Sequence, residues 1–516
     1  MTRRTFFQLA SGAAFGQPQP ATPPPLNFVV ILIDDMGWAD LGYQGSTFYE
    51  TPNIDRLAAA GVRFTNGYAA CPVCSPSRAA IMTGRFAART GITNYLPGSH
   101  PLPHSKMIGP MCKQYLDPSE ITIAEALQPA GYVSGHVGKW HLGASKEYWP
   151  EAQGFAMNVG GTNSGMPKSF FWPQWGDNPP IEGKHDGEYL TDRLTDEAIG
   201  FIRAHRQRPF FLYLPHYTVH VPIEAKEETA RRFRGKARQP GSAQNDPVYA
   251  AMISSLDDNV GRLLSALEEE KIADRTVVVF TSDNGGLSAP EWKLKPVTSN
   301  APLREGKGHV YEGGIRVPFI VKWPGVKPRV DDTPVCGIDL MPTFCRAAGV
   351  AAPSAVDGLS LISLITKRRA LAGRELYWHY PHYSNQLGKP GGAIRQGNFK
   401  LVEMYEDGSL ELYDLAKDIG ERTDLAARMP KKTRALHAKL VKWRASIPGL
   451  QMPSPNPAYD PQTAGIGYWW QTSDRPGVKP CRGGVDIHRF VRNTGIINEY
   501  RNARFPERCF RQNRAE

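Results

Sequence analysis

The stretch FVVILIDD, residues 28–35, decides the fold class of this 516-residue chain. An uninterrupted apolar run of this length is typical of a strand that is buried on both faces, as in a parallel sheet. A second run, TVVVFTSDN, residues 276–284, also ends in polar side chains. Ligands of open α/β sheets bind beyond the carboxyl ends of the strands. We therefore expect the polar residues after both strands to meet at one sheet edge: Asp34, Asp35, Asp283 and Asn284.

Helical patterns lie between the apolar runs. Thr51, followed by proline, and Gly61 have the residue types of an N-cap and a terminal glycine, and a second, shorter helix is predicted from Pro76 onward. Residues 252–267 carry apolar side chains at helical spacing, directly before the second strand. This alternation of strands and helices indicates an α/β domain, which we assign to residues 26–365.

The pattern changes near residue 366 to short β segments separated by turn residues. We interpret residues 366–450 as a small antiparallel α+β domain. The predicted elements are three strands and one helix, over residues 393–395, 400–404, 410–414 and 431–446. The remaining residues, 451–516, are rich in proline, glycine and arginine, and they predict an irregular basic tail.

The N-terminus reads MTRRTFFQLASGAAFG, with two adjacent arginines before a short, weakly apolar stretch. This pattern resembles a twin-arginine export signal. We expect residues 1–25 to be this signal and a proline-rich linker, and the mature protein to be periplasmic or extracellular. The alternative is a disordered N-terminal arm.

Composition and charge exclude several classes of protein. Most of the net charge of +11 lies in the two ends of the chain, so the body does not have the basic surface of a nucleic-acid binder. No apolar run after the N-terminus approaches the roughly 20 residues of a membrane span. Seven cysteines are too few for a disulfide scaffold at this length, although they leave room for one or two bridges.

A distinctive segment, CSPSRAAIMTGR, begins at Cys74 and contains the pattern C-x-P-S-R. Further segments accompany it along the chain: IDDMG (33–37), GKWHLG (138–143), PHYTVHVP (215–222), SDNG (282–285), and PLREGK (302–307) leading to EGGIRVP (312–318). With these segments the chain resembles the formylglycine-dependent sulfatases of the alkaline phosphatase superfamily over residues 26–460. The resemblance implies an α/β fold with a central mixed sheet flanked by helices, and a smaller C-terminal antiparallel α+β domain.

Hydrolysis of a sulfate monoester requires a nucleophile for sulfur, cations around the transferred group and an acid for the leaving alcohol. The resemblance implies that a formylglycine-generating maturation enzyme oxidises Cys74 to an aldehyde. One hydroxyl of its hydrate would attack sulfur, and the other would expel sulfate by reforming the carbonyl. Cys74 also lies at the predicted N-terminus of a helix, where the helix dipole favours an anion.

The polar residues after the two strands are hard oxygen donors of the kind that Ca²⁺ or Mg²⁺ prefers. Three carboxylates that converge without a cation would also repel one another. The resemblance favours one Ca²⁺ per chain, bound by Asp34, Asp35, Asp283, Asn284 and an oxygen of the modified Cys74. The alternative is that these residues merely end strands or cap helices.

Two basic segments complete the predicted site. Arg78 lies one helical turn after Cys74 and can reach back to it; by resemblance it steadies the hydrate and the metal ligands. Lys139 and His141 alternate on a segment that we expect to be extended, which would direct both side chains to one face. By resemblance, Lys139 holds a sulfate oxygen and His141 takes the proton of the second hydroxyl.

Two further residues come from the resemblance alone. It assigns His220, rather than His216, to sulfate binding or to protonation of the leaving oxygen, together with Lys307.

The aromatic stretch WHYPHY, residues 378–383, lies in the small domain. We expect it to be a loop that either binds sugar rings, with His379 and His382 as substrate-binding residues, or forms the core of the domain junction.

These observations predict a sulfatase that acts on a sulfated carbohydrate or an aryl sulfate. A phosphonate monoester or phosphodiester hydrolase is the closest alternative, because such relatives share the modified cysteine and the metal site. A non-catalytic glycan-binding relative is the alternative from another class.

Overall fold

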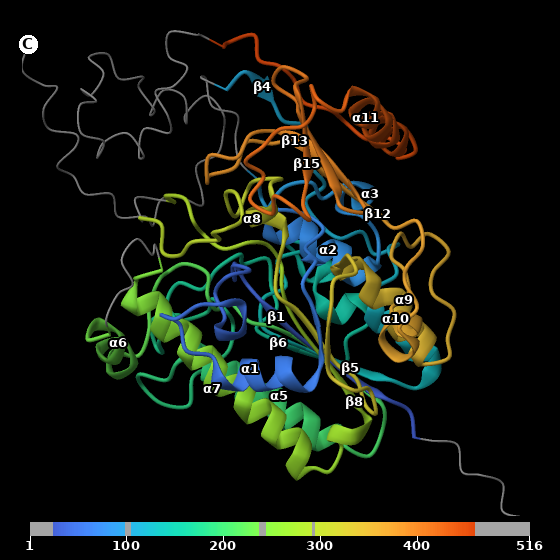
Figure 1. Ribbon diagram of the computed structural model, residues 1–516. Coiled ribbons are helices and arrows are strands. Elements are labelled where there is room, and N and C mark those ends of the chain that lie inside the picture. Colours follow the sequence, from blue (N-terminus) through green and yellow to red (C-terminus); the bar gives the residue numbers. More distant parts are fainter. Residues whose placement is uncertain (1–23, 99–104, 237–243, 292–294, 460–516) are drawn as a thin grey trace, which may run out of the picture. The chain divides into compact units, whose positions relative to one another are not determined.

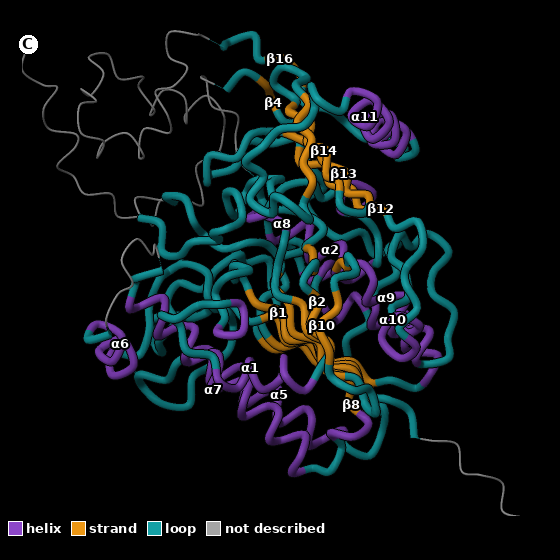
Figure 2. The backbone as a smooth tube through the Cα atoms, viewed as in Figure 1, coloured by secondary structure: helices purple, strands orange, loops and turns teal. Residues whose placement is uncertain are grey.

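The computed structural model describes residues 24–98, 105–236, 244–291 and 295–459, all within one compact unit of the chain. Their main feature is an eight-stranded sheet with the order β10-β2-β9-β8-β1-β7-β5-β6 (Figures 1 and 2). In chain order its strands are β1 (Asn27–Ile33), β2 (Val62–Phe64), β5 (Val133–Val137), β6 (Met157–Val159), β7 (Phe210–Pro215), β8 (Thr276–Ser282), β9 (Phe319–Lys322) and β10 (Arg329–Asp331). The two runs that predicted buried strands are β1 and β8.

The sheet is mixed, and β1 lies in its middle. β1 pairs in parallel with both β7 and β8, and β9 pairs antiparallel with β8 and β2. Alternate residues of β1 belong to two cores, since Val29 and Ile31 face one and Phe28 and Val30 the other. Every residue of β1 is buried, as a strand covered on both faces requires.

Helices cover both faces of this sheet (Figure 1). One core includes residues of α1 (Pro52–Ala60), α5 (Leu190–His205), α6 (Glu227–Arg234) and α7 (Pro247–Glu269). The other includes residues of α2 (Cys74–Thr83), α4 (Ile123–Leu127), α9 (Leu340–Ala347) and α10 (Ile362–Lys367). The predicted α/β class, with a central mixed sheet flanked by helices, is therefore confirmed.

The first helix is capped differently from the prediction. The Thr51 hydroxyl accepts a hydrogen bond from Gly42 N and donates to Asp55, and it makes no cap to α1. Instead, the Asp257 carboxylate of α7 accepts hydrogen bonds from the first-turn amides of Asn53 and Ile54, at 3.0 and 2.8 Å. A long-range carboxylate thus takes the place of the predicted local cap.

A second sheet lies in the C-terminal part of the described chain. It is antiparallel with the order β12-β13-β14-β15, and helix α11 packs against it (Figure 1). Its elements are β12 (Glu375–Tyr380), β13 (Gly391–Gln396), β14 (Phe399–Met404), β15 (Leu410–Asp414) and α11 (Pro430–Ala445). The smaller antiparallel α+β part of the predicted fold is confirmed.

The expectation that residues 378–383 form a loop is wrong for the first half of that stretch, which ends β12. Leu376, Trp378 and Tyr380 alternate into the core, and the Trp378 indole donates to Ala69 O at 2.8 Å. These two aromatic side chains therefore form the core of the domain junction. The dense aromatic composition obscured the two-residue period.

Short elements complete the described chain: η1 (Gly42–Gln44), β3 (Gly67–Tyr68), α3 (Ala87–Thr90), β4 (Met107–Ile108), η2 (Gln128–Ala130), η3 (Lys146–Tyr148), η4 (Pro150–Gln153), η5 (Ala273–Arg275), α8 (Glu312–Ile315), β11 (Val335–Cys336), η6 (Gly337–Asp339) and β16 (Ser454–Pro455). β16 belongs to the segment predicted as an irregular tail, and it pairs antiparallel with β4. The predicted export signal, apart from its last two residues, and the tail from 460 onward lie outside the described residues.

Within the described ranges, no helix has the length and apolar character that crossing a membrane requires. The five cysteines in these ranges are free thiols, so none of them forms a disulfide bridge. The proposed boundary between residues 365 and 366 falls within α10. The division into domains stays a prediction.

Candidate active site

The carboxyl ends of β1 and β8 bring the four polar residues together. The two strands are in register, with Ile33 opposite Ser282. Asp35 N donates to Asp283 Oδ1 at 3.2 Å, and Asn284 Nδ2 donates to Asp35 Oδ1 at 2.8 Å. Asp35 has a φ of 62°, a left-handed conformation that is uncommon for a residue with a side chain. All four side chains are buried.

Cys74 is the first residue of α2, with 3% of its surface exposed. One turn later, the Arg78 guanidinium reaches the carboxylates at the sheet edge. Its Nη2 lies 2.8 Å from Asp283 Oδ2 and 3.4 Å from Asp34 Oδ1, and its Nη1 donates to Lys139 O at 2.8 Å. Arg78 thereby ties α2 to both strands.

His141 lies directly against Cys74, with its Nδ1 3.4 Å from the Sγ. Its Nε2 is 2.6 Å from the backbone carbonyl of Leu96, which can only accept a hydrogen bond. The ring proton is therefore on Nε2, and the lone pair of Nδ1 faces Cys74. Burial, Lys139 and Arg78 hold the pKa of His141 well below its usual value, which keeps the ring neutral.

The predicted extended geometry of this segment is wrong. β5 ends at Val137, and His141 has a φ of 62°. Lys139 and His141 reach the same site because the loop turns sharply, which strand alternation does not describe. Lys139 Nζ lies 2.7 Å from Asp34 Oδ2, and the lysine is completely buried.

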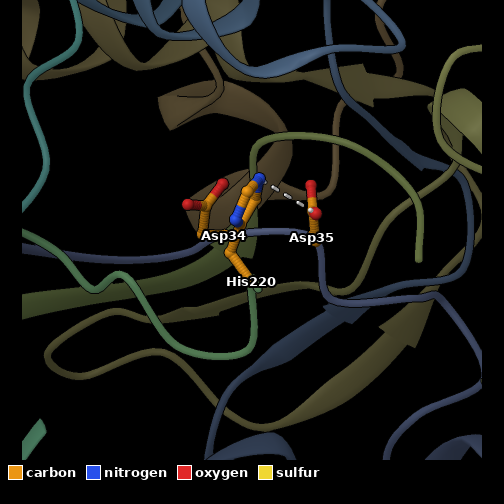
Figure 3. A group of neighbouring side chains, drawn as sticks. All are labelled: Asp34, Asp35 and His220. Atoms are coloured by element: carbon orange, nitrogen blue, oxygen red, sulfur yellow. Dashed lines mark ion pairs between the residues drawn. The ribbon is translucent and has the colours of Figure 1, made fainter. Parts of the chain in front are cut away.

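His220 and Lys307 close the opposite side. Figure 3 shows the His220 ring beside Asp34 and Asp35. His220 Nδ1 donates to Val221 O at 3.0 Å, so its Nε2 offers a lone pair to Lys307 Nζ, which is 3.0 Å away. Lys307 Nζ also donates to Asp35 Oδ2 at 2.7 Å. The resemblance did not assign His216 to the site, and no side-chain hydrogen bond joins it to this cluster within the described residues.

Charge around the site is nearly balanced. Burial would lower the pKa of Lys307, but Asp35 and Glu291 raise it well above its usual value. Burial also opposes the charged form of Asp35, yet Lys307 and His220 lower its pKa overall. Burial raises the pKa of Asp34 to about 8, aided by Asp283 and Asp35 and opposed by Lys139. A bound cation would lower this pKa and favour the ionised carboxylate of Asp34.

The structure therefore weakens one argument for a metal and supplies another. Carboxylate repulsion alone does not require an ion, because Lys139, Lys307 and Arg78 each neutralise one aspartate. However, Asp34 Oδ1 and Asn284 Oδ1 are buried oxygens without a hydrogen bond in the described structure. Two orphaned hard oxygens at the same sheet edge fit a divalent cation such as Ca²⁺. Ligand atoms of Asp34, Asp35 and His220 also lie within 4.8 Å of one another.

The two histidines of the C-terminal domain have protein partners instead. His382 Nε2 lies 2.9 Å from Thr93 Oγ1. His379 Nδ1 and Nε2 lie 2.8 Å from Tyr405 OH and 3.3 Å from Gln451 O. Burial lowers the pKa of His379 to about 4 and that of His382 to about 3. Their assignment to substrate stays a prediction, and the contacts are those of a domain junction.

Two contributors were absent from the sequence prediction. The Leu96 carbonyl fixes the tautomer of His141 through a backbone atom, which no residue pattern reveals. The Glu291 carboxylate lies 3.8 Å from Lys307 Nζ. The sequence shows only that a glutamate lies between the SDNG and PLREGK segments, and no motif marks it as a site residue.

The mixed α/β fold and the site together define a hydrolase of the alkaline-phosphatase-like class. Residues 26–350 match the family model described as Sulfatase, and residues 306–446 match the one described as N-sulphoglucosamine sulphohydrolase, C-terminal. The chain belongs to the sulfatase family and is a sulfuric ester hydrolase.

Several relatives are similar over most of their length. A sulfatase of Formosa agariphila is 34% identical over 489 residues, covering 79% of this chain and 85% of its own. Human N-acetylgalactosamine-6-sulfatase is 36% identical over 379 residues, 69% of each chain. The crystal structure of Ps i-CgsB in complex with k-i-k-neocarrahexaose is 29% identical with a TM-score of 0.69, covering 87% of this chain and 98% of that one.

Proposed function

We propose that this enzyme hydrolyses sulfate monoesters of a sulfated carbohydrate, with Cys74 converted to formylglycine and one Ca²⁺ at the sheet edge. The observation that carries the proposal is the position of Cys74: its Sγ faces the His141 lone pair beside the Asp34–Asp283 cluster. One similar protein is named an N-acetylgalactosamine-6-sulfatase, and another was crystallised in complex with k-i-k-neocarrahexaose. The sugar-directed part of the proposal rests on them.

The thiol sulfur of Cys74 stands where an oxygen of the aldehyde hydrate would lie. That hydrate would supply a hydroxyl nucleophile for sulfur and a second hydroxyl whose deprotonation releases sulfate. His141 is oriented to accept that proton at Nδ1, because its Nε2 is fixed on Leu96 O. The low pKa of this buried imidazole leaves the lone pair free at neutral pH.

The cationic side chains bind the anionic part of the substrate. Lys139 lies beside Asp34 and is positioned to hold a sulfate oxygen as well as the carboxylate. Lys307 keeps its proton firmly, and its neighbour His220 presents a lone pair to it. Lys307 is therefore positioned to donate a hydrogen bond to the leaving oxygen, and His220 orients it.

Ca²⁺ would add positive charge at the sulfate and orient the nucleophile. The residues that would hold it are Asp34, Asp35, Asp283 and Asn284, with an oxygen of the modified Cys74. Arg78 bridges Asp34 and Asp283 and so holds two of these carboxylates in place.

The test combines mass spectrometry with kinetics. Protein made together with a formylglycine-generating enzyme should show an aldehyde in the peptide that contains Cys74, and it should hydrolyse 4-nitrophenyl sulfate and monosulfated sugars. An unmodified thiol under these conditions would contradict the proposed nucleophile and favour a glycan-binding role. A large preference for 4-nitrophenyl phosphonates over the sulfate would favour the phosphonate monoester or phosphodiester hydrolase instead.

The proposal includes export. The twin-arginine pattern within residues 1–25 supports secretion to the periplasm or beyond, where sulfated polysaccharides are met. Fusing residues 1–25 to a reporter and replacing Arg3 and Arg4 by lysines should abolish its export. Continued export of the lysine variant would contradict a twin-arginine signal.

A further inference from the structure

One carboxylate at the active site has no role in the proposed chemistry. Glu291 is 4% exposed, as deep as Cys74 at 3% and Lys307 at 5%. Its Oε2 is buried and has no hydrogen-bond partner in the described part of the chain. Burying a carboxylate oxygen without a hydrogen bond is costly, and a ligand that donates to this oxygen would offset the cost.

The other carboxylates of the site differ from Glu291 in their pairing. Asp34, Asp35 and Asp283 each lie within 2.8 Å of a cationic nitrogen. Glu291 Oε2 instead lies 3.8 Å from Lys307 Nζ, which is beyond hydrogen-bond distance. At this distance the carboxylate still stabilises the positive charge of Lys307. Its Oε2 nevertheless remains able to accept a hydrogen bond from a ligand.

Lys307 also has a hydrogen-bond donor to spare. An ammonium group carries three N–H donors, and the described structure uses two of them, on Asp35 Oδ2 and His220 Nε2. An oxygen between Lys307 and Glu291 could accept from the ammonium and donate to the carboxylate at the same time. A sugar ester could supply the same two bonds from neighbouring carbons. Its ester oxygen would accept a hydrogen bond from Lys307, and the adjacent hydroxyl or amide N–H would donate one to Glu291.

We infer that Glu291 determines specificity by accepting a hydrogen bond from a hydroxyl or amide N–H on the sugar carbon next to the sulfated one. This inference rests on the proposed function, since Lys307 must face the leaving oxygen. The same carboxylate repels a second sulfate or a carboxylate at that position. The substrate class is therefore a sugar with a neutral hydrogen-bond donor beside the scissile ester.

The experiment compares esters that differ in this donor. Wild type, Glu291→Gln and the control Glu305→Gln are assayed with the monosulfated sugar that wild type cleaves best, its deoxy analogue at the neighbouring carbon, and 4-nitrophenyl sulfate. Glu305 is a suitable control because it lies in the same loop region, is 46% exposed and pairs with His309 instead of Lys307. Thermal unfolding checks that each variant is folded.

The expected result is a selective loss. Glu291→Gln should reduce kcat/KM for the hydroxylated sugar by about 10- to 100-fold, the range of a hydrogen bond to a charged group. Its effect on the deoxy sugar and on 4-nitrophenyl sulfate should stay within about 3-fold, and Glu305→Gln should change neither. Should the glutamine variant not fold, Glu291→Asp, which keeps the charge but withdraws it by one methylene, should give the same selectivity.

Two outcomes overturn the inference while leaving the proposed function intact. Equal losses on all three esters would mean that Glu291 only maintains the charge of Lys307, and no loss on any would mean that it does not meet the substrate. If wild type with the verified aldehyde cleaves none of the esters, the proposed function fails first, and the inference fails with it.

Discussion

Two clusters of buried charge lie in different parts of the described molecule. At the active site, Asp34 and Asn284 keep oxygens without hydrogen bonds beside fully buried cations. At the junction of the two sheets, Lys400 of β14 lies between Glu312 Oε1 at 3.0 Å and Glu421 Oε1 at 2.8 Å, with no exposure. The clusters are similar in burial but differ in what their carboxylates bind.

The carboxylates of the junction cluster are paired within the protein, although Glu421 Oε1 meets Lys400 only as an ion pair and has no hydrogen bond in the described structure. Glu312 also accepts from Tyr68 OH at 2.7 Å, and Glu421 accepts from Glu312 N at 2.7 Å. Burial alone would raise the pKa of Glu312, but Lys400 and Arg316 lower it to about 2. Burial and Glu312 raise the pKa of Glu421 to about 7, although Lys400 opposes this. The junction cluster connects elements through ion pairs, whereas the active-site cluster is the one that we propose binds a cation and the substrate.

The largest expected effect is a loss of activity without a loss of stability at the active-site cluster, from Cys74→Ala. Loss of the nucleophile should reduce kcat on 4-nitrophenyl sulfate on the order of 10⁶-fold, as for other enzymes that act through a covalent nucleophile. Thermal unfolding should change little, because a small side chain at the edge of the core is lost. Cys71→Ala is the matched control: this buried thiol lies three residues earlier and faces a hydrophobic core, so its turnover should be nearly normal. Wild-type rates for Cys74→Ala would show that the nucleophile is elsewhere.

The next effect concerns stability at the junction. Lys400→Met keeps the length of the side chain but leaves two buried carboxylates facing each other. The free energy of unfolding should fall by about 3–5 kcal/mol, the usual cost of removing one partner of a buried ion pair. Urea denaturation measures this, with the 85% exposed Lys417 as the control site, where Lys417→Met should have almost no effect. A small change for Lys400→Met would mean that the junction cluster does not stabilise the fold.

Calcium should stabilise the active-site cluster and leave the junction unaffected. At a free concentration 100 times its Kd, Ca²⁺ should raise the free energy of unfolding by about 2.7 kcal/mol, and EGTA should reverse the effect. Asp283→Asn should lose most of this gain because one ligand charge is removed. Asp274→Asn, an exposed residue just before β8, should keep it. If the unfolding midpoint does not respond to Ca²⁺ in wild type, the oxygen cluster is not a calcium site.

The smallest effect tests a third kind of buried carboxylate, one that has backbone amides as partners. Asp257→Ala removes the acceptor for the amides of Asn53 and Ile54 at the start of α1. Stability should fall by about 1–2 kcal/mol, as for the loss of a helix cap. Asp258→Ala changes the next, exposed residue of the same helix and should have little effect. Equal losses in both variants, measured by urea denaturation, would show that α1 does not depend on this cap.

Much of the fold was predictable because its central strands are continuous apolar runs and its long helix has apolar residues at helical spacing. β1, β8 and α7 follow directly from apolar runs and helical spacing. β12 was missed because aromatic residues stand on both of its faces: Trp378 and Tyr380 face the core, Tyr377 is only partly buried, and the aromatic run hides this alternation. The cap of α1 was missed for a different reason: its acceptor, Asp257, lies 204 residues away along the chain.

The sequence by itself determined which chemical groups are available and the order in which they occur, since strand ends, the C-x-P-S-R segment and the basic loops are local patterns. Only the tertiary structure decided which groups meet. Asp35 and Asp283 are 248 positions apart, and parallel pairing of β1 with β8 brings them into contact. The tautomer of His141, the oxygens without hydrogen bonds and the ion pair of Glu291 with Lys307 are likewise properties of contacts between segments of the described chain, which no local pattern encodes.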